Sequence, residues 1–179
     1  MKTLYLMCGM PFSGKTTLGK SIAEYLEAPY VSLDEINEAR GLFGGDGIPV
    51  EEWEKTHHLA MQLSAKLIKT GFDIILDDTN CFRWLRDRFR DFASQHGYQT
   101  VVVFLNVPLS EIWRRIQNNN RTKTRHTVKQ SIVREMAQTF EPPQDDEAII
   151  IYTVEQPIDK WLDKHFAADL NYPSKQCDR

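Results

Sequence analysis

Residues 3–17 of the chain read TLYLMCGMPFSGKTT, and this stretch decides the fold. Its first part, Thr3–Cys8, is a short apolar run that is typical of a buried strand. Its second part, Gly9–Thr16, fits the pattern G-x-x-x-x-G-K-S/T, which requires a strand before it and a helix after it. An apolar stripe with helical spacing follows at Leu18, Ile22, Tyr25 and Leu26. The stretch therefore predicts a strand, a glycine-rich loop and a helix in direct succession.

The loop is predicted to bind the phosphates of ATP. Its glycines let the backbone curl tightly, so that successive N–H groups and the positive end of the following helix face phosphate oxygens. We expect Lys15 to reach the β- and γ-phosphates and to act in catalysis, and Thr16 to ligate Mg²⁺ through its hydroxyl. The expected nucleotide-binding residues are Gly9, Met10, Pro11, Phe12, Ser13, Gly14, Lys15, Thr16 and Thr17.

Apolar runs alternate with helical patterns along the rest of the chain. Four further strands are predicted, at Tyr30–Leu33, Phe72–Asp77, Tyr98–Asn106 and Ala148–Tyr152. Continuous apolar runs suit strands that are buried on both faces, and the alternation predicts an α/β fold with a five-stranded parallel sheet between two layers of helices. The predicted helices include Glu51–Thr70 and Ile158–Phe166. We expect a single domain over residues 1–170 and a polar C-terminal tail over residues 171–179.

Polar residues follow two of the predicted strands, where ligands bind in such folds. Asp34 follows the second strand. If the ATP-binding loop serves phosphoryl transfer to a hydroxyl, Asp34 is our candidate for the base that takes the proton from that acceptor hydroxyl. The third strand ends in Asp77-Asp78-Thr79-Asn80, and one carboxylate of this pair, either Asp77 or Asp78, is expected to serve Mg²⁺. We assign the metal to Thr16 and Asp78. Thr79 and Asn80 are expected to contact substrate or to cap the next helix.

A basic segment over residues 114–127 is predicted to form a helical lid. Asn118-Asn119-Asn120 is expected to break the first helix, and Thr127-Val128-Lys129-Gln130 is a capping box that predicts the start of a second. Arginine pairs with phosphate oxygens through its planar fork, so Arg121 and Arg125 are the expected catalytic lid residues.

Composition limits the partners. The 179 residues include 22 Lys and Arg against 25 Asp and Glu, a net charge of −3, which argues against bulk binding to nucleic acid or to an anionic membrane. Three cysteines without metal-site spacing favour a reducing compartment. Thr3–Cys8 is too short for a signal-peptide core or a membrane span, and no later segment meets either requirement better. We therefore expect a cytoplasmic protein with no membrane partner.

These motifs resemble those of the P-loop kinase group, which includes AAA-type ATP-binding and zeta-toxin-like proteins, polynucleotide 5′-hydroxyl kinases and small-molecule O-phosphotransferases. The resemblance rests on GMPFSGKTT at 9–17, SLDE at 32–35, DDTN at 77–80, the arginine-rich segment and FEPP at 140–143. It implies a three-layer α/β/α P-loop NTPase fold with a helical lid, Asp34 as general base and Arg121 as the lid arginine. It also implies that Asp78-Thr79-Asn80 matches the Asp-Thr-Asn of the group.

One departure from the resemblance concerns the acceptor. Polynucleotide kinases carry an arginine three positions after the base, and Asn37 stands at that position here, with Arg40 one helical turn further on. We count Asp34, Asn37, Arg40, Thr79 and Asn80 as the candidate substrate residues.

The sequence thus predicts an ATP-dependent phosphotransferase that acts on the hydroxyl of a small or nucleoside-like molecule. No glutamate follows the aspartate pair to activate water, which disfavours a simple ATP hydrolase. Two alternatives stay open: a kinase of polynucleotide 5′-hydroxyls or of a tRNA-linked group, and an ATP-switched binding module or toxin-like regulator. The sequence does not name the acceptor or the oligomeric state.

Overall fold

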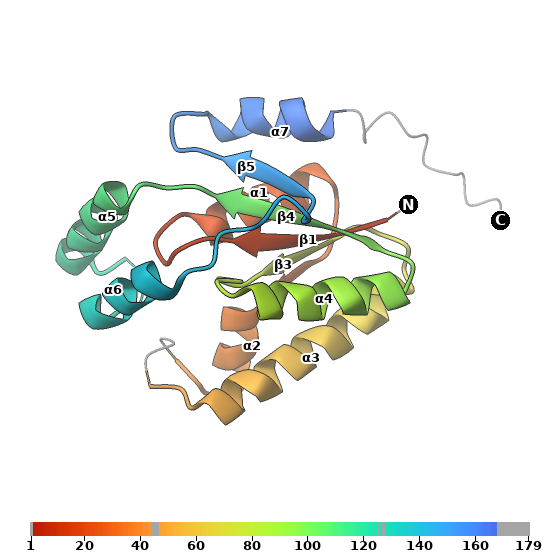
Figure 1. Cartoon of the computed structure of the whole chain (residues 1–179), viewed down its shortest axis with the longest axis horizontal. Coiled ribbons are helices and arrows are strands. Elements are labelled where there is room, and N and C mark those ends of the chain that lie inside the picture. Colours follow the sequence, from red (N-terminus) through yellow and green to blue (C-terminus); the bar gives the residue numbers. More distant parts are fainter. Residues whose placement is uncertain (1, 44–46, 125, 127, 168–179) are drawn as a thin grey trace.

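Five parallel strands form one sheet in the computed structural model, which describes residues 2–43, 47–124, 126 and 128–167 (Figure 1). The strand order is β2-β3-β1-β4-β5. The strands are β1 (Thr3–Cys8), β2 (Tyr30–Ser32), β3 (Ile74–Asp77), β4 (Gln99–Leu105) and β5 (Ile149–Tyr152). All neighbouring pairs are parallel, so every strand ends at the same edge of the sheet. The predicted five-stranded parallel sheet is confirmed.

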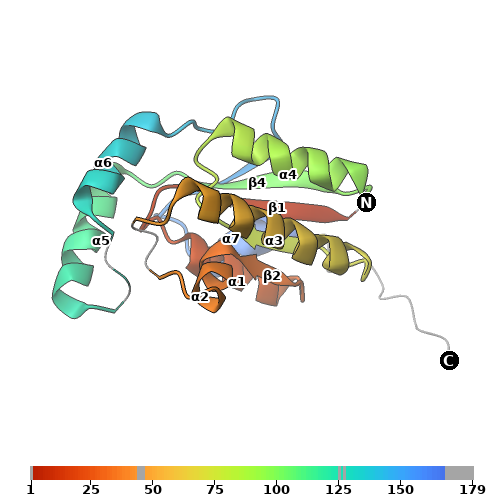
Figure 2. The ribbon, with the colours of Figure 1, turned by 90° about the horizontal axis from the view of Figure 1, so that it is seen from below.

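Helices cover both faces of this sheet. One face carries α1 (Lys15–Tyr25) and α7 (Ile158–Phe166), and the other carries α2 (Leu33–Ala39), α3 (Val50–Ile68) and α4 (Arg83–Gln95). A further pair, α5 (Leu109–Thr122) and α6 (Gln130–Thr139), lies beyond the carboxyl ends of β1 and β4 in Figures 1 and 2. The result is three layers with an additional helical pair at the carboxyl edge.

Side-chain alternation along the strands builds one core on each face. In β1, Tyr5 and Met7 face α1 and α7, whereas Leu4 and Leu6 face α3 and α4. All six residues of β1 are buried, because the strand lies in the middle of the sheet and is covered on both sides. The strand that leads into the glycine-rich loop is therefore paired with β3 and β4 at its two edges and packed against helices on both faces.

The strand order brings the candidate site together. β3 lies between β1 and β2, and Asp77 at its end is level with Met7 of β1 and with Ser32 of β2. The loop after β1, the start of α2 after β2 and residues 77–81 after β3 consequently meet at one edge. This convergence follows from the topology, because residues 34 and 77 are far apart in the chain.

Two predictions about the lid are wrong. Asn118-Asn119-Asn120 does not break a helix, since α5 runs without interruption from Leu109 to Thr122. Asn119 is buried, and its side chain accepts a hydrogen bond from the Thr124 hydroxyl at 3.2 Å. Such tertiary burial overrides the weak helix propensity of asparagine. The second helix begins at Gln130 with Lys129 as its N-cap, three residues later than the capping box predicted.

Several expectations lie outside the described residues. They concern Arg125, Thr127 and the polar tail at 171–179. Among the residues that the structure describes, no helix is both long and apolar enough to cross a membrane.

Candidate functional site

The glycine-rich loop connects β1 to α1 in a conformation that only glycine permits at its first position. Gly9 has φ +155°, and a Cβ atom added there would lie 3.0 Å from Ser13 Oγ and 3.2 Å from the carbonyl oxygen of Leu105. Gly14, with φ +104°, is the N-cap of α1. A side chain at Gly9 would strain the backbone and collide with neighbours, so the close curl of the loop depends on this residue.

The side chain of Lys15 folds back onto the loop that precedes it. Its ammonium nitrogen donates to the carbonyl oxygen of Met10 at 3.0 Å. Burial lowers the pKa of Lys15, while the charges of Asp77, Asp78 and Asp34 act in the opposite direction. The ammonium group therefore lies within the field of three carboxylates, in a position from which it can exchange the Met10 carbonyl for a phosphate oxygen.

The remaining loop residues differ in accessibility. Met10, Phe12 and Ser13 are buried, Pro11 and Gly14 are half-buried, and Thr16 and Thr17 are exposed. The buried side chains of Met10, Phe12 and Ser13 thus support the loop from the protein interior. Contact with a nucleotide would come from the backbone and from the hydroxyls at 16 and 17.

Asp77 is the carboxylate that meets the loop. Its Oδ2 atom accepts a hydrogen bond from the hydroxyl of Thr16 at 2.8 Å and another from the hydroxyl of Tyr30. Burial, followed by the charge of Asp77, raises the pKa of Tyr30, which keeps the phenol protonated as a donor. The other oxygen, Asp77 Oδ1, is buried and has no hydrogen-bond partner among the described residues.

These oxygens fit a magnesium ion. Mg²⁺ prefers oxygen ligands and is usually bound through one or two carboxylates together with phosphates and water. The Thr16 hydroxyl and the Asp77 carboxylate supply such oxygens, and the buried, unpartnered Oδ1 atom has capacity for a metal-bound water. No cluster of three His, Cys, Asp or Glu side chains suited to a metal occurs within the described ranges.

Asp78 faces a different partner. Its Oδ2 atom lies 3.4 Å from Nε2 of His57 on α3, whose Nδ1 donates to the carbonyl oxygen of Trp53 at 2.8 Å. Burial alone lowers the pKa of His57, but contact with Asp78 outweighs it and raises the pKa above its ordinary value. Burial opposes ionisation of Asp78, yet the contact with His57 holds its pKa below the usual range. The geometry therefore separates the two aspartates and favours Asp77, not Asp78, as the partner of Thr16.

Asp34 is exposed in the first turn of α2, whose N-terminus is capped by the Ser32 hydroxyl accepting from the Glu35 N–H at 3.2 Å. Its charge acts on Lys15. An accessible carboxylate near the lysine of the loop is in a suitable place to meet an acceptor hydroxyl.

Three of the expected substrate residues have structural partners instead. Asn37 is buried and accepts from the Thr56 hydroxyl, and the guanidinium of Arg40 donates to Thr56 and to the carboxylate and carbonyl of Glu52. Both residues thus join α2 to α3. Asn80 is fully buried and donates from Nδ2 to the carbonyl oxygen of Met7 at 2.8 Å. The Asn80 side chain thus supports the end of β1 and has no exposed surface.

Thr79 stays at the edge of the site. Its backbone carbonyl accepts from the Gly9 N–H at 3.1 Å, and its half-buried hydroxyl donates toward Cys81 Sγ at 3.7 Å. The Gly9 contact joins the segment after β3 to the start of the phosphate loop.

Sequence reasoning missed the arginine that contacts the loop. Arg115 on α5 donates from Nη1 to the carbonyl oxygens of Phe12 and Ser13, at 3.0 and 2.7 Å, and from Nε to Glu111 at 2.7 Å. The predicted Arg121 is exposed in the last turn of α5 and forms no ion pair with another described residue. The Glu111–Arg115 spacing was a readable sign of an ion pair, but a contact across 102 residues was not.

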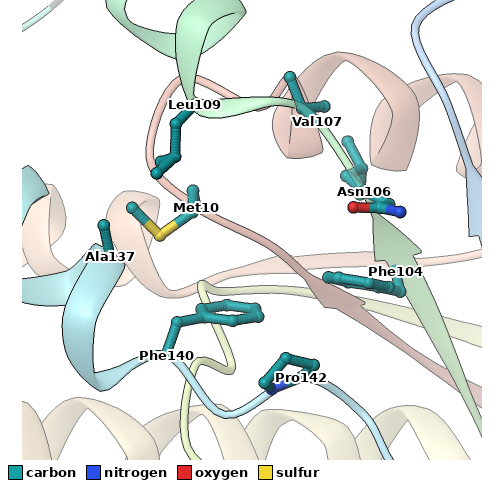
Figure 3. A pocket seen from close by; sticks show the side chains of 9 residues that line it. Met10, Phe104, Asn106, Val107, Leu109, Ala137, Phe140 and Pro142 are labelled. Atoms are coloured by element: carbon teal, nitrogen blue, oxygen red, sulfur yellow. The ribbon is translucent and has the colours of Figure 1, made fainter.

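A hollow of about 240 Å³ lies beside the loop (Figure 3). It is lined by Met10, Phe104, Leu105, Asn106, Val107, Leu109, Ala137, Phe140 and Pro142. Figure 3 shows Met10 and Ala137 close to the ring of Phe140, with the amide of Asn106 on the opposite side. The lining comes from both connections of the α5–α6 pair, so this pair is incompletely packed against the loop.

Comparison with known proteins identifies the family of the chain. A family model described as an AAA domain matches residues 4–143. Over 31 residues the chain is 45% identical to shikimate kinase from Chlamydia pneumoniae, a match that covers 17% of this chain and only 18% of that protein. The chain therefore spans less than a fifth of the length of this curated relative.

Two solved structures share the whole fold. The gluconokinase from Sinorhizobium meliloti 1021 superimposes with a TM-score of 0.67 at 20% identity, covering 94% of this chain and 93% of its own. The APS kinase CysC of Mycobacterium tuberculosis, solved with AMPPNP and APS, has a TM-score of 0.68 at 16% identity and covers 94% and 96%. At identities this low, the likeness shows that the proteins share the three-layer α/β/α P-loop fold, and no more than that.

Proposed function

The chain belongs to the AAA domain family and to the P-loop kinase group, and we propose that it transfers the γ-phosphoryl group of ATP to the hydroxyl of an acceptor molecule. The observation that carries this proposal is the meeting of Lys15, Thr16, Asp77 and Asp34 at one sheet edge, from three different strand ends. A phosphate loop alone would serve any nucleotide-binding protein. The exposed carboxylate of Asp34 beside the loop lysine is what favours transfer to a hydroxyl.

Each residue has a proposed task. The backbone N–H groups of Gly9–Thr17 bind the phosphates, and Lys15 stabilises negative charge on the transferring group. Thr16 and Asp77 hold Mg²⁺, which when bound offsets charge on the phosphate oxygens. The oxygen of the acceptor hydroxyl bonds to the γ-phosphorus while the bond between this phosphorus and the ADP oxygen breaks. Asp34 accepts the proton that the hydroxyl loses. The products are a phosphate monoester and ADP.

A small molecule is the proposed acceptor. The similar proteins are named as gluconokinase, shikimate kinase and APS kinase, which supports a small acceptor over a polymer. A polynucleotide acceptor is disfavoured at these two positions. Asn37 is buried and uncharged. The guanidinium of Arg40 is already bound to Glu52 and Thr56, so it is not available to a nucleic-acid phosphate. The net charge of −3 points in the same direction.

An acceptor panel tests the proposal. ATP consumption and product phosphorylation are measured with sugars and sugar acids, other alcohols, nucleosides and 5′-hydroxyl oligonucleotides. We expect a small hydroxyl compound to give stoichiometric ADP and phosphate ester. Transfer to oligonucleotides alone, with a steep loss on adding salt, would establish the polynucleotide alternative, whereas no transfer to any acceptor despite ATP binding would support a binding module.

Variants of the two aspartates should differ in their metal dependence. Asp77→Asn is expected to raise the Mg²⁺ concentration for half-maximal activity by about 10- to 100-fold, because Asp77 is the carboxylate bonded to Thr16. Asp78→Asn should leave this value within about twofold, because Asp78 faces His57 instead. Magnesium titrations of both variants decide the assignment, and the reverse pattern would restore Asp78 as the metal residue.

The lid arginines give a second comparison. Arg115→Met is expected to lower kcat/KM for ATP by about 10- to 100-fold, since it removes the only guanidinium that the described residues place on the loop carbonyls. Arg121→Met, in the same helix but exposed, is the matched control and should cost less than about threefold. Steady-state kinetics with varied ATP measure both. A larger loss in the Arg121 variant would return the catalytic task to the predicted residue.

A further inference from the structure

Arg86 on α4 is fully buried, and all five of its N–H groups face acceptors. Its Nε and Nη2 atoms donate to the two carboxylate oxygens of Glu147, at 2.7 and 3.1 Å, and both side chains have no exposed surface. Its Nη1 atom donates to the carbonyl oxygens of Asn80 and Glu141, both at 2.9 Å, and Nη2 also approaches that of Pro142 at 3.5 Å. A single guanidinium therefore holds two separate segments of backbone, one at Asn80 and one at Glu141 and Pro142.

The two segments belong to different parts of the proposed site. Asn80 ends the stretch that carries Asp77 and Asp78, whereas Glu141 and Pro142 form the exit of α6, the second lid helix. The two segments also bond directly, since the Glu141 N–H donates to the carbonyl oxygen of Cys81 at 2.8 Å. In Figure 1 the chain leaving α6 passes beside the start of α4 on its way to β5.

Asn80 continues the connection to the phosphate loop. Its amide nitrogen donates to the carbonyl oxygen of Met7, two residues before Gly9, and its backbone has φ +45°. The Cys8 thiol donates to the same Asn80 carbonyl that Arg86 holds, at 3.4 Å. A continuous series of contacts thus runs from the lid exit through Arg86 and Asn80 to the base of the loop.

Stability alone does not account for this arrangement. Removing two charges from water is costly, and apolar residues of similar volume often replace a buried ion pair without loss of stability. What an apolar pair cannot supply is the set of hydrogen bonds to the carbonyl oxygens of Asn80, Glu141 and Pro142. The fork of arginine, with fixed donor directions, sets the distance between these carbonyls.

We propose that Arg86 is a positioning residue that fixes the exit of the lid helix to the aspartate segment, so that lid placement and the position of Asp77 are coupled. This inference rests on the proposed function for its catalytic consequence, but not for the coupling itself. Glu147 orients the guanidinium and neutralises it. Contacts of Arg86 with the carbonyl oxygens carry the coupling.

Matched variants in the full chain separate coupling from stability. The double variant Arg86→Met, Glu147→Leu removes both buried charges and is expected to stay folded with a lowered Tm, because the carbonyl oxygens of Asn80 and Glu141 lose their guanidinium donors. Arg83→Met is the control, because it lies on the same helix and loses ion pairs to Asp87, Asp146 and Glu147, whereas its side chain donates to none of the carbonyl oxygens that Arg86 contacts. In nucleotide-free protein, hydrogen exchange at residues 77–83 and 139–147 is expected to rise about tenfold in the double variant only. Equal exchange in the two folded variants would overturn the proposal.

Kinetics supply the readout that a purely structural pair would not change. With an acceptor identified by the panel, the double variant should show kcat reduced by about 10- to 100-fold and a KM for ATP within about twofold of wild type. An unchanged kcat with altered Tm would make the pair merely structural. Failure of AMPPNP to protect the amides of Gly9–Thr17 would instead count against the proposed function, while the nucleotide-free exchange result would still decide the coupling.

The wild-type chain provides the test if the double variant does not fold. Native-state hydrogen exchange in increasing urea should show residues 77–83 and 139–147 opening together, with one common dependence on urea. Separate opening of the two segments would contradict the coupling.

Discussion

Replacement of Lys15 by methionine is expected to lower kcat/KM for phosphoryl transfer by about 10³-fold. The side chain carries a positive charge that lies over the loop and within the field of Asp77, Asp78 and Asp34. Methionine has a similar length and no charge. Its side chain therefore occupies the same space in the loop, but the transferring phosphoryl group loses its principal cation. Initial rates at saturating acceptor measure the loss.

The control for Lys15→Met is Lys20→Met. Lys20 lies on the same helix but is exposed and paired with Glu35, so its loss should change the rate by less than about twofold. Circular dichroism and Tm of both variants show whether the fold is kept. A Lys15→Met protein that is folded and retains more than about a tenth of the wild-type rate would contradict the proposed task of the lysine.

Asp34→Asn is expected to reduce transfer by about 10²- to 10⁴-fold while the affinity for ATP stays near that of wild type. An amide keeps the shape and exposure of the side chain but cannot take the proton of the acceptor hydroxyl. Single-turnover rates with a good acceptor, together with calorimetric titration of AMPPNP, separate the two quantities. The assignment of Asp34 as base fails if transfer persists at near the wild-type rate.

Glu35→Gln is the matched control for Asp34→Asn. Glu35 is the next residue on the same helix turn, is also exposed, and pairs with Lys20 away from the loop. We expect its variant to transfer phosphate within about twofold of wild type. A comparable loss in both variants would point to a general effect of negative charge at the start of α2, not to proton transfer.

The two aspartates after β3 show how far sequence reasoning reached. Their place at a strand end followed from the apolar run before them, and it is confirmed. Which of the two meets Thr16 depends on the direction of each side chain. Successive residues of a strand point to opposite faces, and the faces here hold different partners, Thr16 and Tyr30 for Asp77 and His57 for Asp78.

The α5–α6 segment shows where sequence reasoning failed. Three asparagines in a row predicted a break, but residue propensities differ by less than about 1 kcal/mol and burial of Asn119 outweighs them. The resemblance to the P-loop kinase group pointed to Arg121, and no pattern in the chain says which face of the helix meets the loop. That face is set by the packing of Ile112 and Ile116 into the core.

By itself the sequence determined the strand, loop and helix at residues 3–26, the five parallel strands and the identity of the phosphate loop. These features are local, because they depend on glycine conformations, apolar periods and caps within a few residues. Tertiary structure alone decided that Asn37, Arg40 and Asn80 serve the scaffold, that Arg115 holds the loop and that Arg86 joins the lid exit to Asn80. These pairings depend on which segments the strand order brings within a few ångströms of one another, and that proximity is a property of the packed chain.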